Sequence, residues 1–214
     1  MDHTVFDDPT TTREEILAAT YRSLRRHGYA DLTIQKIGDE LEQSPSLIYH
    51  HYEDKDALVL ACLEYLLDHF ETEIGRGTIE EPRERLEGLL DWGFGTEMSD
   101  EWQAFMQTIL ELRVQAIHDP AYSEHFTRSD RVFTEAIASI VRAGVDSGEF
   151  QDCEPAAVAE TLQLLHFGRT LRLASTADDL EEWAADVQTE VQQYLERRLY
   201  AGERTCDTED GHHA

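Results

Sequence analysis

The stretch from Thr12 to Val59 reads TREEILAATYRSLRRHGYADLTIQKIGDELEQSPSLIYHHYEDKDALV. Apolar residues three and four apart predict a first helix that ends at Gly28, because glycine readily adopts the backbone conformation of a helix end. Thr33 and Ser44 suit the N-caps of two shorter helices, and Pro45 suits the first position of the last one. A longer helix followed by two short ones around a tight turn is typical of a helix-turn-helix unit.

In such a unit the second short helix enters the major groove of DNA, and its N-terminal residues reach the bases. Here that helix runs from Ser44 to about His51, and Lys55 follows at the start of the next helix. Lys55 is one of only two lysines in the chain, and it stands where a phosphate would lie if the preceding helix occupied the groove. This second short helix, the recognition helix, contains no arginine or lysine, so it cannot form a bidentate contact with guanine.

This stretch resembles the N-terminal domain of TetR-family transcriptional repressors. The resemblance rests on three motifs with matching spacing: Ile16-Leu17-x-Ala19, Gly28-Tyr29-x-x-x-Thr33-Ile34 and Ile48-Tyr49-x-His51-Tyr52-x-x-Lys55-x-x-Leu58. It implies contacts to the DNA backbone from Thr33, Tyr49, His51 and Lys55. It also implies that the following residues face the groove, with a thymine-methyl contact from the leucine: Ser44, Pro45, Ser46, Leu47 and His50.

The turn before the recognition helix departs from the family pattern. The chain has Glu42-Gln43 where the family commonly has Gly-Val, so Glu42 must accept a conformation that glycine takes more easily. His50 and His51 have no second cluster at metal-ligand spacing, so we expect no metal and no cofactor.

The rest of the chain also reads as helix, which predicts an all-α fold. We expect a three-helix DNA-binding domain at residues 10–54, a helical effector-binding and dimerisation domain at 55–200, and a disordered tail at 201–214. Within these domains the sequence predicts a capping box at Thr12-x-x-Glu15 and a helix from Pro82 to about Glu97. The expected subunit faces lie on the last two helices: Leu162, Leu165, Leu173, Val187, Val191 and Leu195.

The segment from Glu101 to Phe150 is similar, more weakly, to the C-terminal domain of choline-responsive repressors of betaine synthesis. The shared elements are Trp102, Phe105, Glu111, Asp119-Pro120 and Gly144-x-x-x-Gly148-Glu149-Phe150. Aromatic residues at helical spacing are more often core than ligand box, so the polar members are the better pointers to a pocket. The expected effector pocket comprises Trp92, Phe94, Trp102, Phe105, Met106, Ile109, Arg113, Phe133, His166, Phe167, Arg169 and Thr170.

Three interpretations of this pocket stay open. Arg113 and Arg169 favour an apolar effector with a carboxylate, and we give this interpretation slightly more weight. The choline-responsive resemblance favours a quaternary amine held over aromatic faces. In the third interpretation both arginines pair with nearby acidic residues, and the pocket is only apolar.

The charge is strongly negative and uneven. The chain has 45 acidic and 18 basic residues, a net charge of −27, yet residues 10–55 carry eight acidic and six basic ones. The acidity is therefore relaxed where a polyanion could dock. In its strong negative charge the chain resembles the proteins of halophilic archaea. The cytosol of these organisms is rich in salt, which at 1 M screens charges within about 3 Å, and a dense carboxylate surface keeps a protein soluble there.

These features predict a homodimeric repressor that binds double-stranded DNA at a palindromic operator and is released by a small-molecule effector. The N-terminus lacks the basic and apolar regions of a signal peptide, and no apolar run has the length of a membrane span, so we expect a cytoplasmic protein without a membrane partner. Two alternatives remain: an enzyme or carrier built on a helical bundle, and a divergent family member without DNA affinity. No nucleophile–base pair or phosphate loop favours an enzyme.

Overall fold

The computed structural model describes residues 6, 9–41, 43–75, 79–95, 99–176 and 180–200. Within these ranges the chain is helical, with one isolated antiparallel bridge between Phe150 and Tyr200, which confirms the predicted all-α fold. Glu42 and the tail at 201–214, for which we expected an unusual turn and disorder, lie outside the described residues. The helices are α1 (Thr12–His27), α2 (Ile34–Leu41), α3 (Pro45–His51), α4 (Lys55–Gly75), α5 (Pro82–Phe94), α6 (Asp100–Gln115), α7 (Pro120–Ser147), α8 (Pro155–Ser175) and α9 (Leu180–Arg198).

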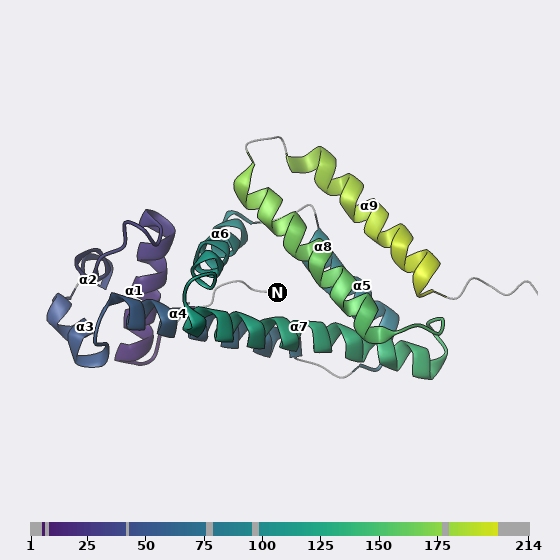
Figure 1. Cartoon of the computed structure of the whole chain (residues 1–214), viewed down its shortest axis with the longest axis horizontal. Coiled ribbons are helices and arrows are strands. Elements are labelled where there is room, and N and C mark those ends of the chain that lie inside the picture. The colour runs from purple at the N-terminus through teal and green to yellow at the C-terminus, as the bar shows by residue number, and fades with distance from the viewer. Residues whose placement is uncertain are drawn as a thin grey trace, which may run out of the picture.

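The first three helices form one end of the molecule, here called the reading head (Figure 1). The predicted caps are confirmed: the Thr33 hydroxyl accepts a hydrogen bond from the Lys36 amide at 3.2 Å, and the Ser44 hydroxyl accepts one from the Ser46 amide at 3.4 Å. Helices α2 and α3 approach closely, since a Cβ on Gly38 would lie 3.1 Å from Cγ of Pro45. This packing fixes the angle at which α3 is presented.

The start of α1 differs from the prediction by one residue. The N-cap is Thr11, whose hydroxyl accepts from the Glu14 amide at 3.2 Å, while the Glu14 carboxylate accepts from the Thr11 amide at 3.1 Å. The same carboxylate also accepts from the amide of Thr10 at 2.7 Å. The capping box predicted at Thr12 and Glu15 is therefore wrong, because only the earlier register lets one glutamate satisfy two free amides.

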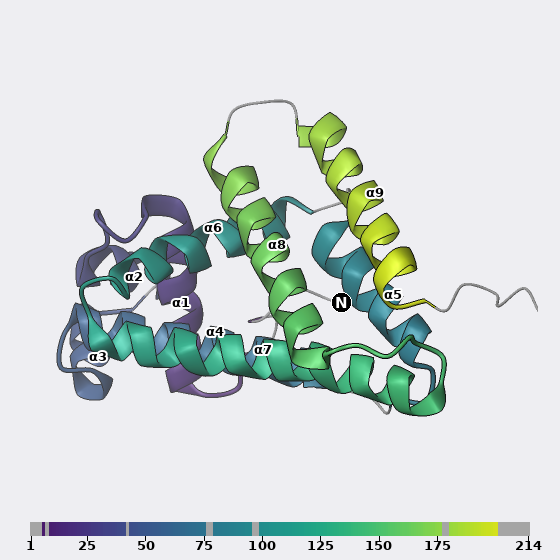
Figure 2. The same cartoon turned by 45° about the vertical axis from the view of Figure 1, so that its right-hand side comes forward.

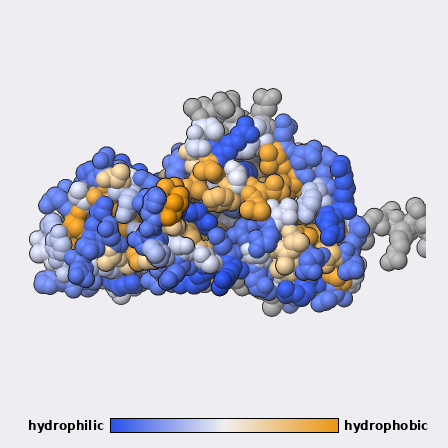
Figure 3. Space-filling model, viewed as in Figure 1, coloured by the Kyte–Doolittle hydropathy of each residue, from blue (hydrophilic) through white to orange (hydrophobic). Residues whose placement is uncertain are grey.

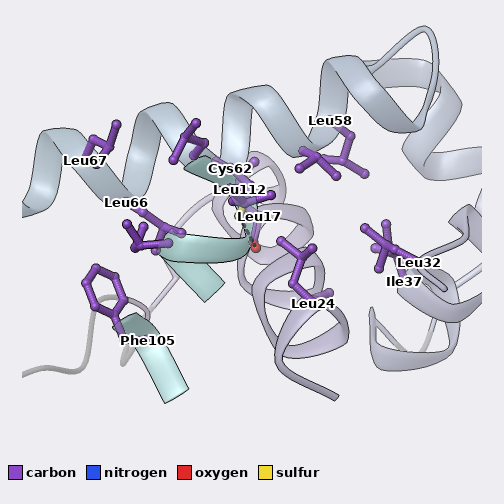
Figure 4. Packing of buried hydrophobic residues seen from close by; sticks show 14 of the residues in the cluster. Leu17, Leu24, Leu32, Ile37, Leu58, Cys62, Leu66, Leu67, Phe105 and Leu112 are labelled. Atoms are coloured by element: carbon purple, nitrogen blue, oxygen red, sulfur yellow. Dashed lines mark hydrogen bonds between the residues drawn. The ribbon is translucent and has the colours of Figure 1, made fainter. Parts of the chain in front are cut away.

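Helix α4 carries the core from the reading head into the rest of the chain. Near its start Leu58 and Cys62 are fully buried against α1, and the Cys62 thiol lies 3.6 Å from the carbonyl oxygen of Leu17. Further along, Leu66 and Leu67 continue the same cluster toward α6. Figure 4 shows this continuous layer of apolar side chains: Leu17, Leu24, Leu32, Ile37, Leu58, Cys62, Leu66, Leu67, Phe105 and Leu112.

The other helices pack around α4 and α7, which run side by side in both views (Figures 1 and 2). Helix α6 lies between the reading head and α8, and α5 packs on α7 at the opposite end. Helix α5 ends at Phe94 instead of about Glu97, because Gly95 follows as the C-cap and donates its amide to the Asp91 carbonyl at 2.9 Å. No described helix is both long and apolar enough to cross a membrane.

The expected subunit faces need correction. Leu162, Leu173, Val191 and Leu195 are buried within the protomer, where Leu162, Val191 and Leu195 belong to a second core that α5, α7, α8 and α9 share. Of the six predicted residues only Leu165 is exposed. Periodicity identifies an apolar face, but it does not reveal whether the same chain or a second copy covers that face.

The motif that starts at Gly144 closes the C-terminal end of α7. Gly148 has φ of 78°, in the left-handed region, and Phe150 then returns so that its amide donates to the Gly144 carbonyl at 2.9 Å. A Cβ at position 144 would overlap the ring of Phe150. The two glycines therefore have different roles: Gly148 permits the turn, and Gly144 makes room for the aromatic ring that follows it.

Substituting Gly144 with alanine should destabilise the protein by about 1–3 kcal/mol, because the added methyl group collides with Phe150. Gly88→Ala is the matched control, since Gly88 is exposed on α5 and a Cβ there meets nothing within 4 Å. The control should be neutral or stabilise by up to about 1 kcal/mol. Urea unfolding at a fixed KCl concentration measures both, and equal stability of the two variants would contradict this account of the motif.

Candidate functional site

The exposed face of α3 carries most of the side chains predicted to meet DNA. Ser44, Ser46, Tyr49, His50 and His51 are all exposed, and Tyr49 leaves 59 % of its surface accessible. The hydroxyl oxygens of Ser44 and Ser46 lie 3.0 Å apart, so one donates to the other beside the first turn of the helix. The first turn of α3 presents hydroxyls rather than amides, because Pro45 has no N–H, the Ser46 amide donates to the Ser44 hydroxyl and the Leu47 amide donates to the Ser44 carbonyl at 2.9 Å.

Two residues of the predicted DNA face are turned partly inward. Pro45 is half-buried against Gly38, and Leu47 is half-buried against the core that contains the fully buried Ile48. Leu47 therefore has only part of its side chain available for the expected thymine-methyl contact. The exposed groups of α3 and its N-cap that could contact a ligand are therefore mainly polar.

The cations of α1 and α2 are largely engaged within the reading head. Arg22 and Arg26 both pair with Glu40, at 3.8 and 2.5 Å. The Lys36 ammonium donates to the carbonyl oxygen of Asp31 at 2.7 Å. These contacts leave Lys55 as the lysine best placed to meet a phosphate.

The ammonium group of Lys55 makes a cation–π contact with an aromatic ring. Its ammonium lies 4.6 Å from the ring centroid of Tyr29, and the Tyr29 hydroxyl donates to the Asp56 carboxylate at 3.2 Å. Tyr29 also makes an edge contact with Tyr122 of α7, with the ring centroids 6.5 Å apart. A cation over a ring face keeps a defined position while its other side stays open.

The effector domain contains a small cavity of about 80 Å³ where α4, α6, α7 and α8 meet. Seven of the predicted pocket residues line it: Phe105, Met106, Ile109, Arg113, Phe133, His166 and Phe167. Six lining residues were missed: Leu67, Phe70, Leu110, Phe126, Ser129 and Asp130. On α7 the spacing of Phe126, Asp130 and Phe133 places them on one helix face, a signal that could have found the first two.

An aromatic cluster surrounds this cavity. Phe70 stacks on Phe133 at 6.1 Å between centroids, and Phe133 stacks on the imidazole of His166 at 5.8 Å. Trp92 and Trp102, which we expected in the pocket, do not line it and lie behind its wall. Their rings are 5.0 Å apart and contact Phe70.

Arg113 is neutralised at the mouth of the cavity. Its guanidinium makes two hydrogen bonds to the Asp130 carboxylate, at 3.0 and 2.6 Å, and lies between the rings of Phe126 and Phe167, at 4.5 and 5.0 Å from their centroids. Gln163 adds a further bond to Asp130 at 3.2 Å. Arg113, Asp130 and Phe167 also line an outer groove of about 410 Å³ between α7 and α8, so they form a wall common to both spaces.

Arg169 and Thr170, also predicted in the pocket, have different surroundings. Arg169 is buried and donates to the carbonyl oxygens of Gly93 and Gly95, at 3.3 and 2.6 Å, where it neutralises the C-terminal end of α5. Thr170 is buried and donates to the carbonyl of His166 on its own helix. Neither of these two residues lines the cavity.

His166 lines the cavity as a neutral ring. Its Nδ1 lies 3.0 Å from the Gly93 carbonyl oxygen, which can only accept, so this nitrogen carries the proton. Burial lowers the pKa of His166 to about 4; the bond to Gly93 acts in the opposite direction, and the charge of Arg169 lowers the pKa further. His166 is therefore uncharged at neutral pH, and Arg113 is paired with Asp130, so neither gives the cavity lining an unpaired cation.

Two family profiles cover most of the chain. The profile described as bacterial regulatory proteins of the tetR family matches residues 16–62, and that described as the BetI-type transcriptional repressor C-terminal domain matches residues 82–199. The repressor AcnR of Corynebacterium glutamicum is 28 % identical over 180 residues, covering 80 % of this chain and 86 % of that protein.

Solved structures agree with these matches. A TetR transcription regulator from Haloarcula marismortui is 34 % identical with a TM-score of 0.77, covering 87 % of this chain and 97 % of that one. A transcriptional regulator from Saccharomonospora viridis, solved in complex with choline, is 20 % identical with a TM-score of 0.74, covering 89 % of this chain and 98 % of that one. This second likeness shows the shared fold.

Proposed function

Since the chain belongs to the TetR family of transcriptional regulators, we propose that it is a homodimeric repressor that binds a palindromic operator through α3 and leaves it when a small quaternary amine occupies the cavity. The observation that carries the proposal is the open polar face of α3 beside Lys55, on a head that shares its core with the effector domain. Effector binding would shift the population away from the state in which two heads match successive major grooves, about 34 Å apart.

The residues of the reading head divide into two roles. Lys55 suits phosphate, and Thr33, Tyr49 and His51 can add hydrogen bonds to the DNA backbone. Ser46 in the first turn of α3 and His50 in its last turn are four residues apart on one helix face, and both are exposed and suit base edges. Sequence reading then depends on neutral hydrogen-bonding groups, while one lysine supplies much of the charge contact.

Replacing Lys55 with alanine should weaken binding equally for all DNA sequences and reduce the salt slope by about one charge, because one phosphate contact is lost. Arg142→Ala, which removes a cation from an exposed pair with Glu135 on α7, is the charge-matched control and should leave the slope unchanged. His50→Ala should instead alter sequence preference. Selection of bound fragments from the source genome at molar KCl, followed by titration, gives both readouts, and an unchanged slope for Lys55→Ala would refute its assignment.

The subunit interface is proposed on the exposed side of α8. Leu164, Leu165 and Leu171 leave 69, 42 and 48 % of their surfaces accessible, and Phe167 lies on the same helix. Figure 3 shows apolar side chains gathered over α8, on the face seen in Figure 1. A contiguous apolar patch on a family that usually acts as dimers favours a second copy of the chain as its occupant.

An aspartate at both Leu164 and Leu171 should split the dimer, because each charge would be buried unpaired at the subunit contact. Ile79→Asp is the control, since Ile79 is an exposed apolar residue that lies between α4 and α5, away from α8. Light scattering at molar KCl should give the monomer mass for the double variant and the dimer mass for the control. A double variant that remains dimeric would remove this face of α8 from the interface.

The chemistry of the cavity favours a quaternary amine over the acidic effector first expected. Arg113 already donates to Asp130, and Arg169 is engaged outside the cavity, so neither arginine is available to receive a carboxylate. The phenylalanine ring faces that line the cavity suit a soft cation. A volume of about 80 Å³ is far below that of drug-sized sites and restricts the ligand to a small molecule. The choline held by the Saccharomonospora viridis regulator supports this class.

Choline should raise the melting temperature by about 5–10 °C at a hundredfold excess over its Kd, while benzoate and octanoate should not. The neutral isostere 3,3-dimethylbutan-1-ol separates charge from shape and should give a much smaller shift. Phe133→Leu should remove most of the choline shift, whereas Phe94→Leu, outside the cavity lining, should keep it. Stabilisation by the acids alone would overturn the choice of a cationic effector.

A further inference from the structure

Glu111 makes an unusual contact across the boundary between the effector domain and the reading head. Its carboxylate accepts a hydrogen bond from the Tyr29 amide at 2.8 Å, although the two residues are 82 positions apart. Gly28, just before, has φ of 70° and ψ of 167°, a conformation almost confined to glycine. A Cβ on Gly28 would lie 2.9 Å from the same carboxylate oxygen. The glycine therefore fits both the turn and the approach of Glu111.

Helix stability does not explain this carboxylate. It lies against the C-terminal end of α1, where the helix dipole disfavours negative charge. Arg25, Arg26 and His27 occupy that last turn, as expected of cations at a helix C-terminus. An acidic group at this end is unfavourable for α1 itself. The favourable contact of Glu111 is instead its hydrogen bond to the Tyr29 amide, in the turn that follows α1.

The held turn leads to the start of α4. The Tyr29 amide is fixed by Glu111, its ring lies below the Lys55 ammonium at 4.6 Å, and its hydroxyl binds Asp56 at 3.2 Å. Lys55 and Asp56 are the first two residues of α4. One carboxylate on α6 thus determines, through a single tyrosine, where the proposed phosphate contact stands.

The other side of α6 lines the effector cavity. Ile109 and Arg113 flank Glu111 at two residues on either side, and such neighbours point to the opposite face of a helix. A displacement of α6 by a bound ligand would therefore be transmitted to the Tyr29 turn through Glu111.

We propose that Glu111 is a positioning residue for DNA binding, which holds the Gly28–Tyr29 turn and thereby the Lys55 ammonium at the phosphate. This inference rests on the proposed function. Glu111 does not line the cavity, and its proposed role in DNA binding is indirect, through Tyr29 and Lys55.

A double-mutant cycle between Glu111 and Lys55 tests the proposal, with the full chain and its selected operator at fixed KCl. Glu111→Ala should weaken DNA binding roughly tenfold, as for the loss of a hydrogen bond to a charged group. In that background Lys55→Ala should cost little more, because the ammonium is no longer positioned. Glu111→Gln keeps an acceptor oxygen and should restore most of the affinity, and Glu135→Ala is the remote acidic control.

Tyr29→Leu gives a second route that leaves Glu111 in place, and it should abolish the effect of Lys55→Ala in the same way. The choline-induced melting shift should persist in every variant, since none alters the cavity lining. Additive effects of Glu111→Ala and Lys55→Ala, or failure of Glu111→Gln to rescue, would overturn the inference alone. Absence of DNA binding by the wild-type chain would overturn the proposed function and this inference with it.

Discussion

Helix α4 belongs to two parts of the molecule at once, and this constraint governs the rest of the structure. Its first half is buried against α1 through Leu58 and Cys62, and its second half supplies Leu67 and Phe70 to the cavity where α4, α6, α7 and α8 meet. Because these side chains are packed on both sides, α4 cannot tilt within the effector domain without carrying the reading head with it. The contact from Glu111 to Tyr29 adds a second attachment, between α6 and the reading head.

The reading head could be predicted almost completely from sequence, because local signals decide it. Thr33 and Ser44 cap their helices as expected, and the spacing from Ile48 to Leu58 matches the buried and exposed positions observed. Two details were missed. A run of three threonines offers two capping registers, and Leu47 is half-buried because it packs against the core. Caps and periodicity act within a few residues and are visible in one sequence.

The effector domain could be predicted only as a set of helices with apolar faces. Whether Arg113 would meet a ligand or an acid depended on Asp130, which lies on another helix 17 residues away. The sequence suggested Arg169 as a pocket residue, but it did not reveal that the end of α5 lies within hydrogen-bond distance of the guanidinium. Val191 and Leu195 have the pattern of a subunit face, yet α9 folds back on its own protomer. Each of these outcomes is decided by the relative placement of helices, which periodicity does not contain.

The paired requirement for Gly28 and Glu111 limits how far this architecture is modular. The glycine leaves the space that the carboxylate fills, and Tyr29 rests on Tyr122 of α7, so the reading head is complementary in shape and charge to one particular effector domain. A head transplanted onto a relative with another residue at the position of Glu111 would keep its fold but lose its docking contact. Exchange of domains between family members during evolution, or in the engineering of biosensors, therefore has to keep α6 together with the first four helices.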